Sequence, residues 1–106
     1  MELKQLQRKS STVFLNNLKR DKIGGSDDYL VMKLAEELGE FVQSYLVYKK
    51  RCRPVKYVPT QQSKRALSKE LADVLGIVLV IARVMKIDVE EALVKKWITR
   101  EWVVKK

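Results

Sequence analysis

Apolar residues recur at helical spacing along most of the chain, and glycine or proline residues interrupt that spacing. The pattern predicts a first helix over residues 2–20, after which the pair Gly24-Gly25 favours a turn. Ser26 is predicted to be the N-cap of a second helix that extends to about residue 50.

The second predicted helix has a single apolar stripe. At 100° per residue, six apolar side chains fall within an arc of about 120°, which is typical of a helix with one buried face. The stripe comprises Leu30, Leu34, Leu38, Phe41, Val42 and Tyr45. Pro54 and Pro59 then interrupt the helical pattern, because proline lacks an N–H group and disfavours helix in the residue before it. We expect a short extended segment over residues 55–58.

The third predicted helix contains the most apolar part of the chain. It begins between residues 60 and 63 and reaches about Met85, and residues 71–82 are apolar on nearly every side. A strand is an alternative for this β-branched run, but the run is longer than a typical strand and its flanks are helical. Because a helix that is apolar on every side must be buried on every side, we expect a second subunit to cover it. A fourth helix opens with the capping box Asp88-x-x-Glu91 and runs to the end of the chain.

Length and composition favour one domain over residues 1–106, since the chain is 46% hydrophobic and 33% charged, and the four predicted helices make that domain all-α. The chain has no histidine, which excludes histidine-based acid–base and nucleophilic chemistry. Its single cysteine, Cys52, excludes an internal disulfide and a thiolate zinc site. The amino terminus is polar, and no apolar run approaches the ~20 residues of a membrane span. We therefore expect a cytoplasmic protein without a membrane partner.

The charge of the chain is strongly positive and unevenly distributed. Its net charge of +9, from 22 Lys and Arg against 13 Asp and Glu, favours an anionic partner such as a nucleotide or a nucleic acid. Residues 46–69, here called the basic segment, hold eight basic residues and no acidic one. The eight are Lys49, Lys50, Arg51, Arg53, Lys56, Lys64, Arg65 and Lys69.

Two acidic motifs next to the basic segment carry the candidate chemistry. They are Glu36-Glu37-Leu38-Gly39-Glu40 and Glu70-Leu71-Ala72-Asp73. Residues three or four apart on a helix are neighbours, so two antiparallel helices would bring up to five carboxylates together. Hard divalent cations such as Mg²⁺ prefer such all-oxygen sites.

The position of Asp73 strengthens this interpretation, because an uncompensated ion within an apolar segment costs several kcal/mol. Gly39 is unfavourable in mid-helix, and we expect it to permit close approach of a second helix. The alternative is that the acidic side chains are solvated, or are paired with Lys33, Lys69 or Arg83.

The residues Lys33-Leu34-Ala35-Glu36-Glu37-Leu38-Gly39-Glu40 and Glu70-Leu71-Ala72-Asp73-Val74-Leu75 resemble the EExxE…ExxD signature of MazG-like, all-α nucleoside triphosphate pyrophosphohydrolases. The resemblance extends over residues 26–96. It implies a four-helix subunit that dimerises through its central helices, or a dimer of such dimers. It also implies Mg²⁺-dependent hydrolysis of a nucleoside triphosphate between the α and β phosphates, which yields a monophosphate and pyrophosphate. Removal of non-canonical or excess nucleotides is the cellular role that this activity implies.

The resemblance also assigns roles to the acidic residues. It implies that Glu37, Glu40, Glu70 and Asp73 hold Mg²⁺, for which Mn²⁺ is a chemically similar substitute. Glu36 would either bind a further cation or deprotonate the attacking water. This chemistry needs no histidine.

Further residues are assigned to the substrate. Lys96 and Arg100 would bind the phosphates, with Arg100 standing where family members often carry Asn; the alternative is that both are surface charges. Phe14, Asn17 and Tyr45 would line the base pocket, because the family places the base between its first helices. Tyr45 lies on the apolar stripe, so a core position is its alternative. The basic segment would cover the triphosphate or attract it, or would be a solvated linker.

Two other functions stay open. A phosphoribosyl-ATP pyrophosphohydrolase would share the metal motifs and the fold. A basic helical nucleic-acid-binding protein is the alternative outside the enzymes, and the net charge of +9 supports it. Against it, the basic residues cluster in a proline-flanked loop instead of along one helix face.

Overall fold

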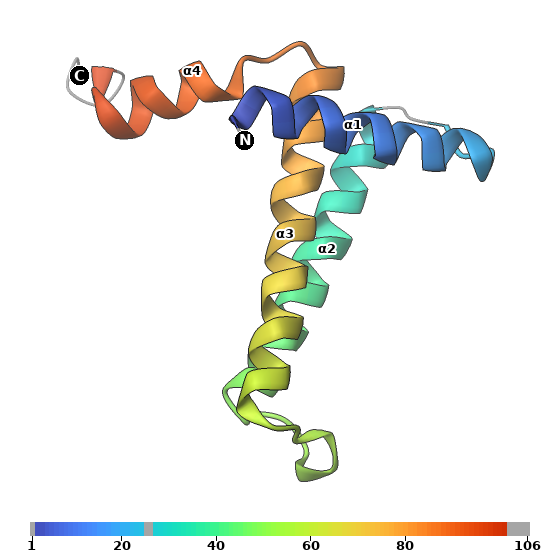
Figure 1. Cartoon of the computed structure of the whole chain (residues 1–106), viewed down its shortest axis with the longest axis vertical. Helices are drawn as coiled ribbons and strands as arrows, with labels where there is room; N and C mark the ends of the chain where they lie inside the picture. Colours follow the sequence, from blue (N-terminus) through green and yellow to red (C-terminus); the bar gives the residue numbers. More distant parts are fainter. Residues whose placement is uncertain (1, 25–26, 102–106) are drawn as a thin grey trace. The chain divides into compact units, whose positions relative to one another are not determined.

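The computed structural model describes residues 2–24 and 27–101, and the regular structure of these residues is entirely helical (Figure 1). The elements are α1 (Leu3–Arg20), α2 (Asp27–Tyr48), the 3₁₀ turn η1 (Pro54–Lys56), α3 (Thr60–Val84), α4 (Val89–Leu93) and the π-helical turn η2 (Val94–Ile98). This confirms the predicted all-α fold and the bounds of its first three helices to within about two residues. The strand alternative for residues 71–82 is wrong. The predicted N-cap, Ser26, lies outside the described residues.

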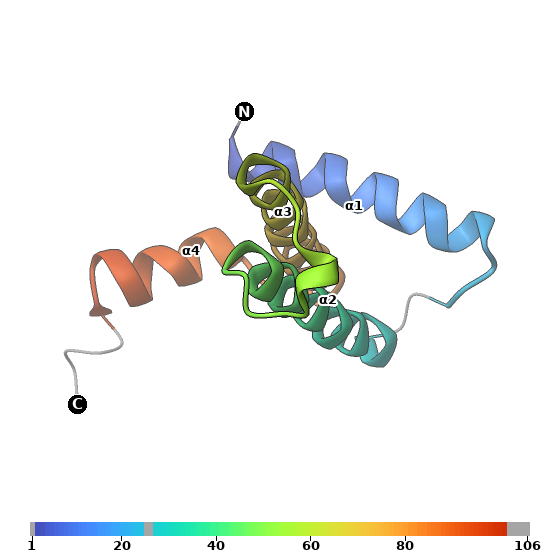
Figure 2. The same ribbon diagram turned by 90° about the horizontal axis from the view of Figure 1, so that it is seen from below.

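The described helices belong to two compact units. The central unit is Asp28–Val78, and the terminal unit combines Met1–Asp27 with Leu79–Lys106. Within the central unit, α2 and α3 lie side by side and run in opposite directions, as both views show (Figures 1 and 2). This antiparallel hairpin places the two acidic motifs on neighbouring helices.

The connection between α2 and α3 differs from the prediction. The turn η1 overlaps the first two residues of the segment expected to be extended; in it the Lys56 N–H donates to the Arg53 carbonyl at 2.8 Å and the Tyr57 N–H to the Pro54 carbonyl at 3.0 Å. The fixed φ of proline suits the first position of a helical turn, and this explains the difference. Extended backbone flanks the turn at Arg53 and Tyr57.

Helices α1, α2 and α3 end in the same Schellman motif, with a lysine in place of the usual glycine. Lys22, Lys50 and Lys86 have φ of 59°, 55° and 58°. At the end of α2, for example, the Arg51 N–H donates to the Leu46 carbonyl at 2.8 Å. The left-handed conformation costs a non-glycine residue ~1 kcal/mol, and a cation at the carboxyl end of a helix partly offsets that cost.

The terminal unit is held together by contacts between its distant segments. The Gln7 side-chain amide donates to the Leu79 carbonyl at 2.9 Å, and Lys4 lies 3.8 Å from Asp88. Both contacts join α1 to the carboxyl-terminal part of the unit. Its buried side chains are Ser11, Leu18, Leu79, Val80 and Ala82.

The fourth helix is shorter than predicted. Asp88 is its N-cap as expected, because its carboxylate accepts a hydrogen bond from the Glu91 N–H at 3.0 Å. However, α4 gives way to the π-helical turn η2, and Arg100 beyond it has a left-handed φ of 55°. The backbone is helical from Val89 to Ile98, but the prediction that the helix runs to the end of the chain is wrong at residues 99–100, and residues 102–106 lie outside the described ones.

The apolar side chains of the predicted helices are only partly buried within one chain. Leu30 and Ile77 are buried, but Leu71 and Leu75 on α3 are each 55% exposed, although we expected residues 71–82 to be covered on every side. On α2, the stripe residues Leu38, Val42 and Tyr45 are likewise exposed. Gly39 is exposed too, and a Cβ added there would meet nothing within 4 Å, so none of the described helices approaches closely at this glycine. None of the described helices is long and apolar enough to cross a membrane.

Candidate functional site

Three carboxylates of the central unit converge between α2 and α3. Glu37 comes from α2, and Glu70 and Asp73, three residues apart on one face, come from α3. One oxygen from each of the three lies within 4.8 Å of the other two. We call this group the carboxylate cluster; it contains three of the five acidic residues that the sequence motifs single out.

The carboxylate cluster contains two buried carboxylate oxygens that lack a hydrogen-bond partner. Oε2 of Glu37 and Oε2 of Glu70 are both buried, and neither has a hydrogen-bond partner. A buried acceptor without a partner costs ~1–3 kcal/mol, and more when the group is charged. The carboxylates with a buried oxygen are therefore those of Glu37 and Glu70, both of which are half-buried residues. The prediction that Asp73 is buried is wrong for the single chain, in which its side chain is exposed.

Glu37 has the clearest electrostatic signature. Burial raises the pKa of its carboxyl group, and the neighbouring Glu40 carboxyl raises it further through a hydrogen bond and charge repulsion. Lys33 opposes both effects, with its Nζ 3.5 Å from Glu37 Oε1. The net shift is upward, so the surroundings of Glu37 disfavour the charged carboxylate.

Lys33 forms its closer contact with Glu36. Its Nζ lies 2.5 Å from Glu36 Oε1, and this hydrogen bond is the main cause of the raised pKa of Lys33. The Glu36 side chain is 58% exposed, compared with 12% for Glu37. The predicted alternative of pairing with Lys33 is thus confirmed for Glu36 and Glu37.

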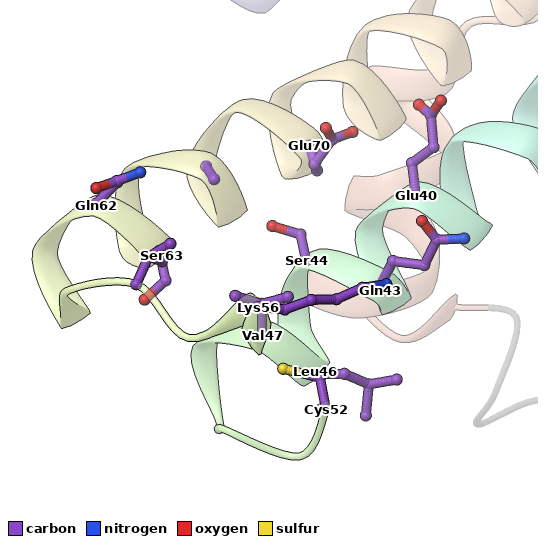
Figure 3. A pocket seen from close by; sticks show the side chains of 12 residues that line it. Glu40, Gln43, Ser44, Leu46, Val47, Cys52, Lys56, Gln62, Ser63 and Glu70 are labelled. Carbon is purple, nitrogen blue, oxygen red and sulfur yellow. The ribbon is translucent and has the colours of Figure 1, made fainter. Parts of the chain in front are cut away.

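A cavity of about 560 Å³ opens beside the carboxylate cluster, between α2, α3 and the loop that joins them (Figure 3). Glu40 and Glu70 form part of its lining. Their side chains come from the two facing helices, as Figure 3 shows. Glu40 therefore lies in the cavity wall and also contacts the carboxyl group of Glu37.

No pattern in the sequence predicts this cavity. Its walls include Gln43 from α2, Gln62 from α3, and Cys52, Lys56 and Val58 from the connecting loop. Only the two prolines and the lack of acids in the basic segment set this region apart in the sequence. Neither signal indicates that the loop folds into a cavity wall.

The residues predicted to bind substrate lie elsewhere. Lys96 is exposed on η2, and Arg100 is exposed beyond it, so the two are not one turn apart on a regular helix as expected. Phe14 is half-buried and Asn17 exposed on α1 of the terminal unit. Tyr45, on α2 of the central unit, is 42% exposed, so its alternative as a core residue is wrong for the single chain.

The comparisons with known proteins agree with the two acidic motifs. The family model described as the MazG nucleotide pyrophosphohydrolase domain matches residues 26–104. The matched range contains both motifs and the whole central unit. Comparison with curated proteins and with solved structures gave no match.

Proposed function

The chain belongs to the MazG nucleotide pyrophosphohydrolase family, and we propose that it hydrolyses nucleoside triphosphates between the α and β phosphates. The products of this reaction are a nucleoside monophosphate and pyrophosphate. The observation that carries the proposal is the carboxylate cluster, which lies within the matched range and beside a cavity.

We propose that Glu37, Glu40, Glu70 and Asp73 hold Mg²⁺, with Mn²⁺ as a substitute; the family in general depends on divalent metals. The donor set fits such an ion, because carboxylate oxygens are hard ligands and two of them are buried without a partner. When bound, the cation would neutralise charge on the phosphates and acidify the attacking water.

The remaining acidic residue, Glu36, is our candidate for the general base. It lies next to Glu37 in sequence, but its side chain is largely exposed and points to Lys33. This exposure leaves Glu36 accessible to a water molecule, while the contact with Lys33 holds its carboxylate in place. Glu36 would accept a proton from the water molecule while the oxygen of that water attacks the phosphorus atom.

Lys96 and Arg100 remain our candidates for binding the phosphates, because both are exposed cations within the matched range. The assignment of Phe14, Asn17 and Tyr45 to a base pocket rests on the family resemblance. The matched range includes residues of both units, which supports the proposal that residues 1–106 form one domain. The proposed role in cytoplasmic nucleotide house-cleaning rests on the family alone.

We further propose that the enzyme is a homodimer, or a dimer of dimers, built through α2 and α3. Leu38, Val42 and Tyr45 follow one another at helical spacing on α2, and Leu71 and Leu75 do so on α3. All five side chains are at least 42% exposed. A second subunit would bury them. Light scattering coupled to size-exclusion chromatography tests this, and a mass of 12.4 kDa would exclude it.

The activity is tested by pyrophosphate release from a panel of ribo- and deoxyribonucleoside triphosphates, with and without Mg²⁺. We expect release that depends on Mg²⁺ and is lost in Glu40→Gln and in Glu70→Gln. Glu90→Gln is the matched control, because it neutralises a half-buried carboxylate in the terminal unit. If no triphosphate is cleaved, or if both site variants keep the wild-type rate, the proposed function is wrong.

A further inference from the structure

The lining of the cavity beside the carboxylate cluster contains both polar and apolar side chains. Glu40 and Glu70 supply carboxylates, and Gln43 and Gln62 supply amide groups from the two facing helices (Figure 3). Much of the remaining lining is apolar and includes Leu46, Val47, Val58 and Ala66. Ligand sites in proteins combine apolar walls with a few placed polar groups in this way.

The charge of the lining argues against phosphates as the only group that this cavity holds. Among the residues that the structure describes, Lys56 is the one cation in the lining, compared with the two carboxylates of Glu40 and Glu70. A pyrophosphate or triphosphate group carries several negative charges and needs more cations than this, or a metal ion. The metal ligands proposed above include Glu40 and Glu70, so the phosphates belong at that part of the lining and an uncharged group belongs against the rest of it.

A nucleoside has the chemistry that the rest of the lining offers. A carboxamide both donates and accepts hydrogen bonds, so Gln43 and Gln62 can pair with the polar edge of a base. The apolar side chains can pack against the faces of the base and the sugar. A volume of about 560 Å³ lies within the range of small-molecule sites, ~300–1,000 Å³.

We propose that this cavity holds the nucleoside of the substrate, and that Gln43 and Gln62 determine which bases the enzyme accepts. The proposal rests on the proposed function and assigns the nucleoside to a place other than the predicted pocket of Phe14, Asn17 and Tyr45. It also gives the basic segment a role, because Cys52, Lys56 and Val58 of this segment form part of the wall.

Cys52 provides a test that does not depend on turnover. It is the only cysteine of the chain, it is half-buried, and it lines the cavity. The measurement is the rate of Cys52 modification by N-ethylmaleimide, followed by mass spectrometry, without Mg²⁺. Each common ribo- and deoxyribonucleoside monophosphate is added in turn. We expect the preferred monophosphate to slow modification about tenfold at ~10 times its Kd, while inorganic pyrophosphate has no effect.

The variants Gln62→Leu and Gln61→Leu form a matched pair. The two glutamines are adjacent on α3, but only Gln62 lines the cavity. We expect Gln62→Leu to weaken the protection of Cys52 and the apparent substrate affinity about tenfold, as the loss of a hydrogen bond in a binding site does. The variant should also change the order of preference among bases. Gln61→Leu should behave as the wild type in both measurements.

The outcomes separate this proposal from the proposed function. If triphosphates are hydrolysed but no monophosphate protects Cys52, the nucleoside binds elsewhere and the cavity assignment is wrong. Protection by pyrophosphate, and not by monophosphates, would also overturn it, because the cavity would then hold phosphates. If monophosphates protect Cys52 but no triphosphate is cleaved, the cavity still binds nucleotides and the proposed reaction is the part that fails.

Discussion

Replacement of Glu70 by glutamine isolates the energetic cost of the carboxylate cluster. Oε2 of Glu70 and Oε2 of Glu37 are buried without partners, and at ~1–3 kcal/mol each they destabilise the metal-free protein by about 2–6 kcal/mol together. Glu70→Gln removes one negative charge from the group and keeps the shape of the side chain. The metal-free variant should therefore be at least as stable as the metal-free wild type.

Addition of Mg²⁺ should reverse this order of stability, so that the wild type becomes more stable than Glu70→Gln. A ligand that binds only the folded state at 100 times its Kd stabilises that state by ~2.7 kcal/mol. For a chain of this size, with ~4 °C for each kcal/mol, the Tm of the wild type should rise by about 10 °C. Glu70→Gln should gain far less, because it has lost a charged ligand of the proposed site.

The assay is thermal unfolding at fixed protein concentration, in EDTA and in increasing Mg²⁺ or Mn²⁺. Glu90→Gln serves as the control and should respond to the metal as the wild type does. Equal metal-induced shifts in Glu70→Gln and the wild type would refute the reasoning. So would a wild type that responds to neither ion.

Three further predictions concern stability. Because the folded state raises the pKa of Glu37, it holds that proton to higher pH than the unfolded chain does, so Glu37 lowers stability above its folded pKa. In urea unfolding with EDTA, the wild type should thus gain stability relative to Glu37→Gln as the pH falls from 7.5 to 5; parallel curves would contradict this. Asp88→Ala should cost ~1 kcal/mol by removing the cap on the Glu91 N–H, while Asp88→Asn retains it; equal losses of Tm would count against the cap. Leu30→Ala should cost ~3 kcal/mol in urea unfolding, because Leu30 is fully buried. Met32→Ala, at a side chain that is 72% exposed, should stay within ~0.5 kcal/mol of the wild type, and similar losses in both would argue against this core.

The sequence determined most of the helical architecture. Hydrophobic spacing, the glycine pair and the two prolines placed the first three helices, because these signals act within one turn of backbone. The same local geometry explains why Glu70 and Asp73 share a face of α3. The acidic motifs were visible for this reason, and so was their resemblance to the family that the match over residues 26–104 then identified.

Tertiary structure decided which of these residues are buried and what surrounds them. The sequence places Asp73 in an apolar segment, yet Glu37 and Glu70 have the buried oxygens, since burial depends on which face of one helix meets the next. The cavity likewise depends on which parts of the folded chain meet. Its wall combines α2, α3 and the loop that joins them, and no short-range pattern specifies where such a loop lies against the helices. Helix periodicity is a property of neighbouring residues, whereas a cavity is a property of segments that meet only in the folded chain.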